Sequence, residues 1–268
     1  MRRRKSLTRP GQPPPSRLGA VVLSRASRGD SDLVVTFLTR DQGLITALAK
    51  NARQSVRRFG GNLLSPGMAA WYYFRQRPGR DLAFVERGEA NPLSPALPSD
   101  PICSALAAWA LELARAFEVH GNPASASVSL LLRHLAALAR TADFRPPALE
   151  PRRLSLGFSK CYLELSGFAP SLDVCHLCGR TSSDIWHWDP VIGGVVCQDC
   201  QDMMNRGTAR MPEGLLAALR ATSAHDGCPQ LDEAQLLAAE LFFQSLASLH
   251  AGRAFKSRKV LYELLAGR

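Results

Sequence analysis

The sequence lacks an apolar run long enough to cross a membrane. Its nearest approach, residues 102–117, is interrupted by Glu112 and Arg115, whereas a spanning helix needs about 20 mostly apolar residues. The start of the chain is basic and proline-rich, without the apolar core of a secretory signal. We therefore expect a protein that stays in the cytoplasm and contacts no membrane.

The sequence also lacks recognisable catalytic and nucleotide-binding patterns. It contains no glycine-rich phosphate loop, and no Ser/His/Asp set or pair of carboxylates stands out. With 268 residues, of which 46% are hydrophobic and 21% charged, the chain is long enough for two domains with ordinary cores. These observations favour a binding protein over an enzyme.

Acidic residues are scarce in the N-terminal third of the chain. Residues 1–17 carry six Lys/Arg and no acid, and residues 40–80 carry eight Lys/Arg against the single acid Asp41. Positive charge gathered in this way predicts a surface for a polyanion such as nucleic acid. The first 17 residues include four prolines and predict a flexible arm, which either touches nucleic acid or only keeps the chain soluble.

Short apolar segments separated by turn signals predict five strands. The separators include "SRGDS", "RDQG" and "RPGRD", which are typical of turns. Five strands in about 70 residues, with a longer connection after the third, are typical of a small closed barrel of the OB type. The strands are expected at residues 18–24, 32–39, 43–50, 68–74 and 82–88.

The connection after the third strand, "KNARQSVRRFGG", contains four cations and an aromatic ring but no carboxylate. Cations can follow a phosphate backbone while an aromatic ring stacks on bases. In the next strand, "WYYF" alternates its rings between the two faces, so one pair fills the barrel and the other either packs or stacks on bases. The predicted DNA-binding residues are Arg40, Lys50, Arg53, Arg57, Arg58, Phe59, Arg75, Arg77 and Arg80.

From about residue 101 the apolar residues recur with helical spacing, for example at Leu106, Trp109 and Leu113. We expect His134 and His250, which lie on such helices, to be ordinary packed side chains. The predicted fold is α+β: a flexible arm (1–17), an OB-fold DNA-binding domain (18–90) and an all-helical domain (91–268) with a zinc-binding insertion at 173–203.

Four of the seven cysteines form two Cys-x-x-Cys pairs separated by 18 residues. This spacing lies within the range of structural zinc sites, in which four thiolates close a tetrahedral shell. A redox couple would need only one pair, placed before a helix in a βαβ unit, and disulfides are disfavoured in the cytoplasm. We predict one structural Zn²⁺ per chain, bound by Cys175, Cys178, Cys197 and Cys200.

The other residues of this segment and the remaining cysteines need no metal role. His176 and His187 are not required as ligands, and Trp186 and Trp188 are expected to pack the hairpin between the pairs. Isolated cysteines behave as small apolar residues, which is the expectation for Cys103, Cys161 and Cys228.

Three segments, in this order along the chain, resemble the RecO family of bacterial recombination mediators: "GDSDLVVTFLTRDQGLITALAKNAR…RRFGG", "LELSGFAPSLDVCHLCG" and "FKSRKVL". The extension before Leu18 is longer than the family pattern. The resemblance implies an OB-fold domain, a helical domain and a zinc knuckle. It implies binding of single- and double-stranded DNA, annealing of complementary strands, and work with RecR, and often RecF, in loading RecA onto DNA coated by single-strand DNA-binding protein at the nucleoid.

The resemblance further implies that the helical domain captures the acidic, apolar-ended C-terminal tail of single-strand DNA-binding protein. Such a tail needs an apolar groove with a cation at its end, where arginine can hold the carboxylate with two hydrogen bonds. The first candidates are Arg152 and Arg153, which precede "LSLGF". The second group, Lys256, Arg258 and Lys259, serves the tail, serves DNA or only solvates a helix start.

Two other classes of function share some of these features. A zinc-dependent nucleic-acid hydrolase or deaminase is disfavoured because a four-thiolate site has no open position, and because the His-x-Glu…Pro-Cys-x-x-Cys signature is absent. A zinc-ribbon transcription or translation factor would share the charge and the zinc, and assays of annealing or RecA loading would separate it from a recombination mediator.

Overall fold

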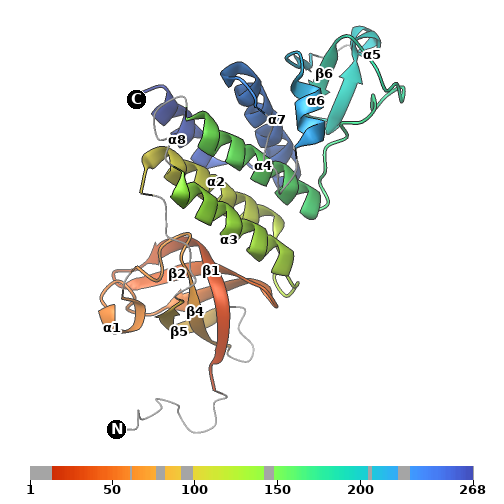
Figure 1. The fold of residues 1–268 in the computed structure, drawn as a ribbon. Coiled ribbons are helices and arrows are strands. Elements are labelled where there is room, and N and C mark those ends of the chain that lie inside the picture. Colours follow the sequence, from red (N-terminus) through yellow and green to blue (C-terminus); the bar gives the residue numbers. More distant parts are fainter. Residues whose placement is uncertain are drawn as a thin grey trace. The chain divides into compact units, whose positions relative to one another are not determined.

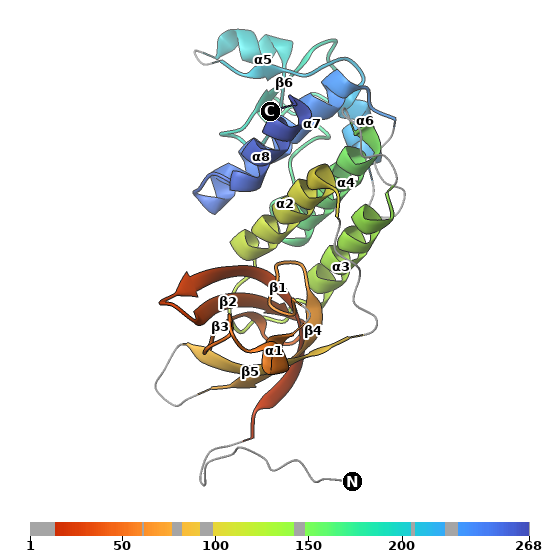
Figure 2. The same ribbon diagram turned by 90° about the vertical axis from the view of Figure 1, so that its left-hand side faces the viewer.

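A computed structural model describes residues 14–60, 62–76, 82–91, 99–141, 148–204, 207–222 and 230–267. The chain divides into two compact units. One comprises Met1–Ser94 with Val119–Ala124, and the other comprises Pro95–Glu118 with Ser125–Arg268 (Figures 1 and 2). None of the helices in the described ranges is long and apolar enough to cross a membrane. The predicted arm up to residue 13, Arg77, Arg80 and Cys228 lie outside the described residues.

The first unit is a five-stranded closed barrel. Its strands are β1 (Ser16–Arg28), β2 (Asp32–Thr39), β3 (Gly43–Ala49), β4 (Ala69–Arg75) and β5 (Ala83–Ala90). They follow the order β1-β2-β3-β5-β4, in which only the β3–β5 pair is parallel. The five strands lie where the short apolar segments between turn signals predicted them, which confirms the barrel. Closure removes the unpaired strand edges of an open sheet.

The barrel core is built around three aromatic rings. Phe37 of β2 contacts Tyr72 and Phe74 of β4, with ring centroids 4.7 and 5.1 Å apart. Alternation along "WYYF" therefore places Tyr72 and Phe74 inside, while Trp71 and Tyr73 lie on the outer face and stay partly exposed. The Tyr72 hydroxyl donates a hydrogen bond to the Leu63 carbonyl oxygen, and burial raises the pKa of this tyrosine.

The second unit is mainly helical, as the sequence predicted. Asp100 caps the first of its helices by accepting a hydrogen bond from the Cys103 backbone N–H. Asp232 and Gln235 form a capping box at the start of α7, and Gly252 ends that helix with φ of 62°. The longer helices are α2 (Pro101–Phe117), α3 (Ser125–Arg140), α4 (Leu149–Leu165), α7 (Glu233–Ala251) and α8 (Lys256–Leu265).

A small cysteine-containing subdomain lies between α4 and α6 (Leu215–Ala221) in the chain (Figure 1). Its three-stranded sheet has the order β7-β6-β8, and its ring Trp188 packs on Phe242 of α7 with centroids 3.6 Å apart. Its elements are β6 (Trp186–Asp189), β7 (Gly194–Cys197), α5 (Gln198–Met203) and β8 (Ala209–Arg210).

A buried ionic cluster ties the helices of the second unit together. Glu240 of α7 accepts two hydrogen bonds from Arg152 of α4, of 3.1 and 2.8 Å, and its carboxylate lies 3.6 Å from Arg258 of α8. All three side chains are at most 2% exposed. The Arg258 guanidinium also stacks on Trp109 of α2, 4.3 Å from the ring centroid. One carboxylate therefore links two cations from two other helices.

This cluster corrects two of the predicted partner-binding residues. Arg152 was a first candidate for the peptide tail, and Arg258 was a second candidate for the tail, for DNA or for a solvated helix start, but both are buried and directed at Glu240. A buried arginine needs a counter-charge, and Glu240, which is distant in the sequence, supplies it to both side chains.

Burial and the nearby Arg258 lower the pKa of His134 to about 3. His134 is accordingly a packed, neutral side chain stacked on Phe158, in agreement with its expected role.

Replacing the shared carboxylate tests how far the helical unit depends on it. We expect Glu240→Gln to lower the free energy of unfolding by about 3–5 kcal/mol, because two buried guanidinium groups lose their counter-charge. Urea unfolding followed by circular dichroism measures this loss. The matched control is Glu263→Gln, which breaks an exposed pair with Lys259 at 3.9 Å and should change stability little. Equal losses in the two variants would contradict the assignment.

Candidate nucleic-acid surface and metal centre

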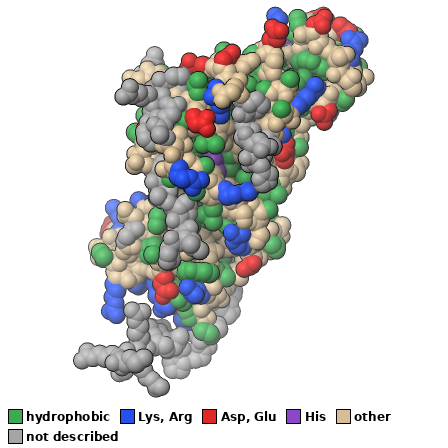
Figure 3. All heavy atoms as spheres, viewed as in Figure 1, with side chains coloured by type: hydrophobic (Ala, Val, Ile, Leu, Met, Phe, Trp, Pro, Cys, Tyr) green, Lys and Arg blue, Asp and Glu red, His purple; other side chains and the backbone are tan. Residues whose placement is uncertain are grey.

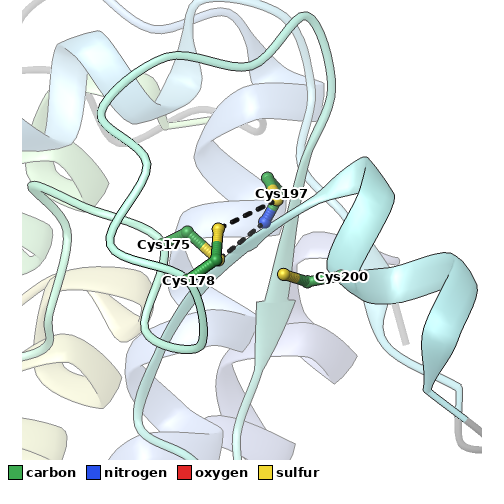
Figure 4. A group of neighbouring side chains, drawn as sticks. All are labelled: Cys175, Cys178, Cys197 and Cys200. Carbon is green, nitrogen blue, oxygen red and sulfur yellow. Dashed lines mark hydrogen bonds between the residues drawn. The ribbon is translucent and has the colours of Figure 1, made fainter.

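Four cysteine side chains converge in the small subdomain. Cys175 and Cys178 lie on the loop before β6, Cys197 ends β7, and Cys200 lies on α5 (Figure 4). Their sulfur atoms are all within 4.8 Å of one another, and all except Cys178 are buried. The structure thus brings together the four residues that the sequence singled out, and this cluster can hold a metal ion.

The backbone around the first pair holds the sulfurs in place. Gly179 has φ of 73°, a conformation that favours glycine, and its N–H donates to the Cys175 carbonyl oxygen at 2.9 Å. The Cys197 backbone N–H points at the Cys175 sulfur, 3.4 Å away. An ion pair between Arg180 and Asp199 joins the loop to α5. Hydrogen bonds and an ion pair therefore hold the Cys197/Cys200 pair next to the Cys175/Cys178 pair.

The electrostatics of the four thiols favour a bound cation. Burial opposes ionisation of Cys175, but hydrogen bonds from the backbone N–H groups of Cys178, Cys197 and Leu177 outweigh it and lower the pKa of this thiol to about 6. Burial raises the pKa values of Cys197 and Cys200. Like charges this close cannot all form without a partner. A divalent cation resolves the conflict because it stabilises all four thiolates at once.

The tryptophans near the cluster pack against it and against α7, as expected from the sequence. His187 shares a 2.8 Å hydrogen bond with the Gln198 side chain, and neither His187 nor His176 belongs to the metal-ligating group found among the described residues. Trp186 packs on the cysteine cluster and Trp188 on α7.

Four of the predicted DNA-binding cations lie on the connection between β3 and β4, which includes the short helix α1 (Val56–Phe59). Lys50, Arg53 and Arg57 are exposed. Arg57 makes no hydrogen bond or ion pair to another residue in the described part of the chain, so its guanidinium is available to a ligand. Arg58 is half-buried and donates to the Ser55 hydroxyl at 2.9 Å and to the Lys50 carbonyl oxygen at 2.5 Å. Arg58 therefore shapes this connection.

The turn between β1 and β2 supports the same connection. The Asp32 carboxylate accepts a 2.7 Å hydrogen bond from the Asn51 backbone N–H, and Asn51 takes φ of 50°. The Arg53 backbone N–H and side chain donate to the carbonyl oxygens of Ser31 and Asp30, at 3.1 and 3.4 Å. The β3–β4 connection contains no carboxylate of its own, but the neighbouring Asp32 carboxylate holds its backbone at Asn51.

Two predicted DNA-binding residues have other roles in the structure. Phe59 is 7% exposed and belongs to the barrel core, because α1 turns its ring inward, so it offers no free face to a base. Arg75 is also 7% exposed and is paired with Glu86 at 2.5 Å. Both are corrections to the sequence-based set. Arg40, at the end of β2, is exposed.

A groove of about 480 Å³ opens beside this connection. Arg53, Val56 and Asn62 line it together with Arg25 and Ser27 of β1, and Val56 is 81% exposed. Arg25 was not among the predicted DNA-binding residues, and its side chain is exposed near the end of β1. Figure 3 shows lysine and arginine side chains at several places on the barrel surface turned to the viewer.

The remaining candidates for partner binding differ in exposure. Arg153 is half-buried and donates a hydrogen bond to the Leu231 carbonyl oxygen. Lys256 and Lys259 are exposed. Lys259 lines a cavity of about 420 Å³ with Phe255, Tyr262 and its ion-pair partner Glu263.

Comparison with known families identifies both units. The family model "Recombination protein O N terminal" matches residues 16–92, and "Recombination protein O C terminal" matches residues 98–259.

Curated relatives extend this match along the chain. The chain is 32% identical to the DNA repair protein RecO of Myxococcus xanthus over 239 residues, which cover 89% of this chain and 93% of the relative. It is 29% identical to that of Desulfatibacillum aliphaticivorans, covering 94% and 98%. It is 36% identical to that of Anaeromyxobacter dehalogenans strain 2CP-C, covering 76% and 77%. Given the barrel, the helical region and the four-cysteine cluster, the chain belongs to the RecO family of DNA repair proteins.

Proposed function

We propose that this protein is a non-enzymatic recombination mediator that binds single- and double-stranded DNA and anneals complementary strands. The observation that carries the proposal is the set of exposed cations Lys50, Arg53 and Arg57 on one barrel connection in a chain of this family. Annealing requires no covalent chemistry. Cations that neutralise two phosphate backbones lower their repulsion and release counterions, while the bases stay free to pair.

The division of labour along the chain follows from this proposal. We assign DNA binding to a domain over residues 18–90, partner contacts to residues 91–268, and a supporting metal site to the insertion at 173–203. Arg25 joins Arg40, Lys50, Arg53 and Arg57 as a DNA contact, since it lines the groove beside the connection. Arg58 acts by positioning that connection.

The partners in the proposal are those of a recombination mediator at the nucleoid in the cytoplasm. They are RecR, in some systems RecF, the C-terminal tail of single-strand DNA-binding protein and, indirectly, RecA. For the tail we favour Lys256 and Lys259, because Lys259 borders the cavity lined by Phe255 and Tyr262. An exposed ammonium beside apolar rings suits a carboxylate that follows apolar residues.

The metal in the proposal is one structural Zn²⁺ per chain. Four sulfurs within 4.8 Å of one another can close a tetrahedral shell, which leaves no coordination position for a substrate or an activated water. This closed donor set favours a supporting role over the zinc-dependent hydrolase or deaminase weighed from the sequence. It does not exclude the zinc-ribbon factor, which the annealing assay distinguishes.

Annealing of DNA coated by single-strand DNA-binding protein tests the function. Two complementary strands, one carrying a fluorophore and the other a quencher, are coated separately and mixed with and without the protein. We expect faster annealing with the protein, and less acceleration when the coating protein lacks its C-terminal tail. No acceleration on either coated or bare strands would contradict the proposed function.

The salt dependence of binding tests the cations on the β3–β4 connection. The variant Lys50→Gln/Arg57→Gln removes two exposed charges, so the negative slope of log affinity against log salt should become shallower by about 1.4, at roughly 0.7 per phosphate contact on single strands. Fluorescence anisotropy with a dT oligonucleotide at several salt concentrations measures it. The control Arg140→Gln/Arg253→Gln removes two exposed cations of the helical unit. An unchanged slope in the first variant would exclude these two residues as phosphate contacts.

Metal analysis of freshly purified protein tests the four-cysteine site. We expect about one zinc per chain, and a loss of metal in Cys178→Ser, because removing a ligand weakens a site whose binding energy also folds the subdomain. The matched control is Cys161→Ser, which changes a cysteine outside the cluster. The affinity for DNA should change little in Cys178→Ser. Wild-type protein without zinc would refute the assignment.

A further inference from the structure

The outer face of β1, β4 and β5 carries a second cluster of cations and aromatic rings. It consists of five side chains that the predicted DNA-binding set does not include, and we call it the outer-face cluster: Arg17, Trp71, Tyr73, Arg87 and Glu89. These strands are neighbours in the barrel, with β4 between β1 and β5. Trp71 and Tyr73 are the two rings of "WYYF" that do not enter the core.

Strand register arranges these residues in two adjacent rows. Tyr73 is paired with Arg17 on one side and Arg87 on the other. Trp71 is paired with Gly19 and Glu89 in the same way. Residues two apart on a strand share a face, so both rows lie on the same outer surface.

Each arginine of the outer-face cluster stacks on a ring. The Arg87 guanidinium lies 3.7 Å from the Tyr73 ring centroid, and that of Arg17 lies 4.3 Å from the Trp71 centroid. Glu89 links these side chains. It accepts a 3.0 Å hydrogen bond from the Tyr73 hydroxyl and lies 3.3 Å from Arg87 and 3.9 Å from Arg17. The ring covers one face of the planar guanidinium group, and the opposite face of that group stays open to a ligand.

Glycine at position 19 gives the Trp71 ring its place. A Cβ atom at Gly19 would lie 3.3 Å from the Trp71 ring, so the ring occupies space that a side chain would otherwise fill. The indole can therefore lie along the sheet next to Arg17. Glycine at position 19 thus leaves the room that the Trp71 ring occupies on this surface.

Exposure and charge indicate the kind of ligand this surface fits. The side chains of Arg17 and Arg87 are 50% and 46% exposed, and two cations face one carboxylate. Residues 1–15, which precede β1, contain five further Lys/Arg and no acid in the sequence. Bases stack on aromatic rings and on guanidinium planes, while the unused N–H donors of arginine can bind phosphate oxygens.

We propose that the outer-face cluster is a second binding surface for single-stranded nucleic acid, distinct from the β3–β4 connection. The proposal rests on the function proposed above and deepens it. Annealing brings two strands together, and a barrel with two separate surfaces can hold a segment of each. Bases stack on the open guanidinium faces and on the exposed parts of the two rings, and phosphates bind the remaining N–H donors.

Photocrosslinking and binding together test this surface in the full-length protein. A dT oligonucleotide that contains 5-bromouracil is irradiated with wild-type protein and with Lys50→Gln/Arg57→Gln, and the crosslinked peptides are mapped. We expect crosslinks at Trp71 or Tyr73 in both proteins. The variant Arg17→Gln/Arg87→Gln should make the negative slope of log affinity against log salt shallower by about 1.4 and slow annealing. Arg140→Gln/Arg253→Gln again serves as the control.

A second variant separates stacking from folding. Trp71→Leu keeps apolar cover over Gly19 but removes the ring, so it should lower affinity for the oligonucleotide roughly tenfold, with a circular dichroism spectrum like that of wild type. Annealing by wild type, with no crosslink at either ring and no change of slope in Arg17→Gln/Arg87→Gln, would overturn this inference alone. Wild type that neither binds nor anneals DNA would overturn it together with the proposed function.

Discussion

Closure of the five strands is the constraint on which the proposed activity depends. Because the barrel pairs its strands in a ring, its stability comes from inward rings such as Phe37 and Tyr72 and not from the cations on its surface. The β3–β4 connection and the outer face can therefore accumulate positive charge around a core that does not need it. Two cations of the outer face share the one carboxylate of Glu89, and the β3–β4 connection contains none. Both surfaces therefore keep a net positive charge, and binding of a polyanion should weaken as salt increases.

Buried charge and the four sulfurs stabilise the second unit in a different way. Glu240 joins two arginines from two helices, so the helices around it are held by one carboxylate that cannot be removed without leaving cations unpaired. The small cysteine subdomain has only a short sheet and a few buried apolar residues, so we expect the proposed metal to supply part of its folding energy. In this account neither feature takes part in chemistry.

Local patterns in the sequence predicted the strands, the helices and the metal cluster. The strands follow from short apolar segments between turn signals and the cluster from the spacing of two Cys-x-x-Cys pairs, and both depend on neighbouring residues. Arg152 was misread because its partner, Glu240, is 88 residues away. Phe59 was misread because the orientation of a four-residue helix decides that its ring enters the core. The outer-face cluster depends on the register of three strands, which composition does not reveal.

We propose that this chain brings complementary DNA strands together by charge, without cutting or modifying them. The most direct measurement follows annealing of two labelled complementary strands at increasing salt, with no nucleotide added, and then separates the products on a denaturing gel. The account predicts that the protein speeds annealing most at low salt and that both strands are recovered at full length. Strands that are cut or modified, or an acceleration that does not depend on salt, would contradict it.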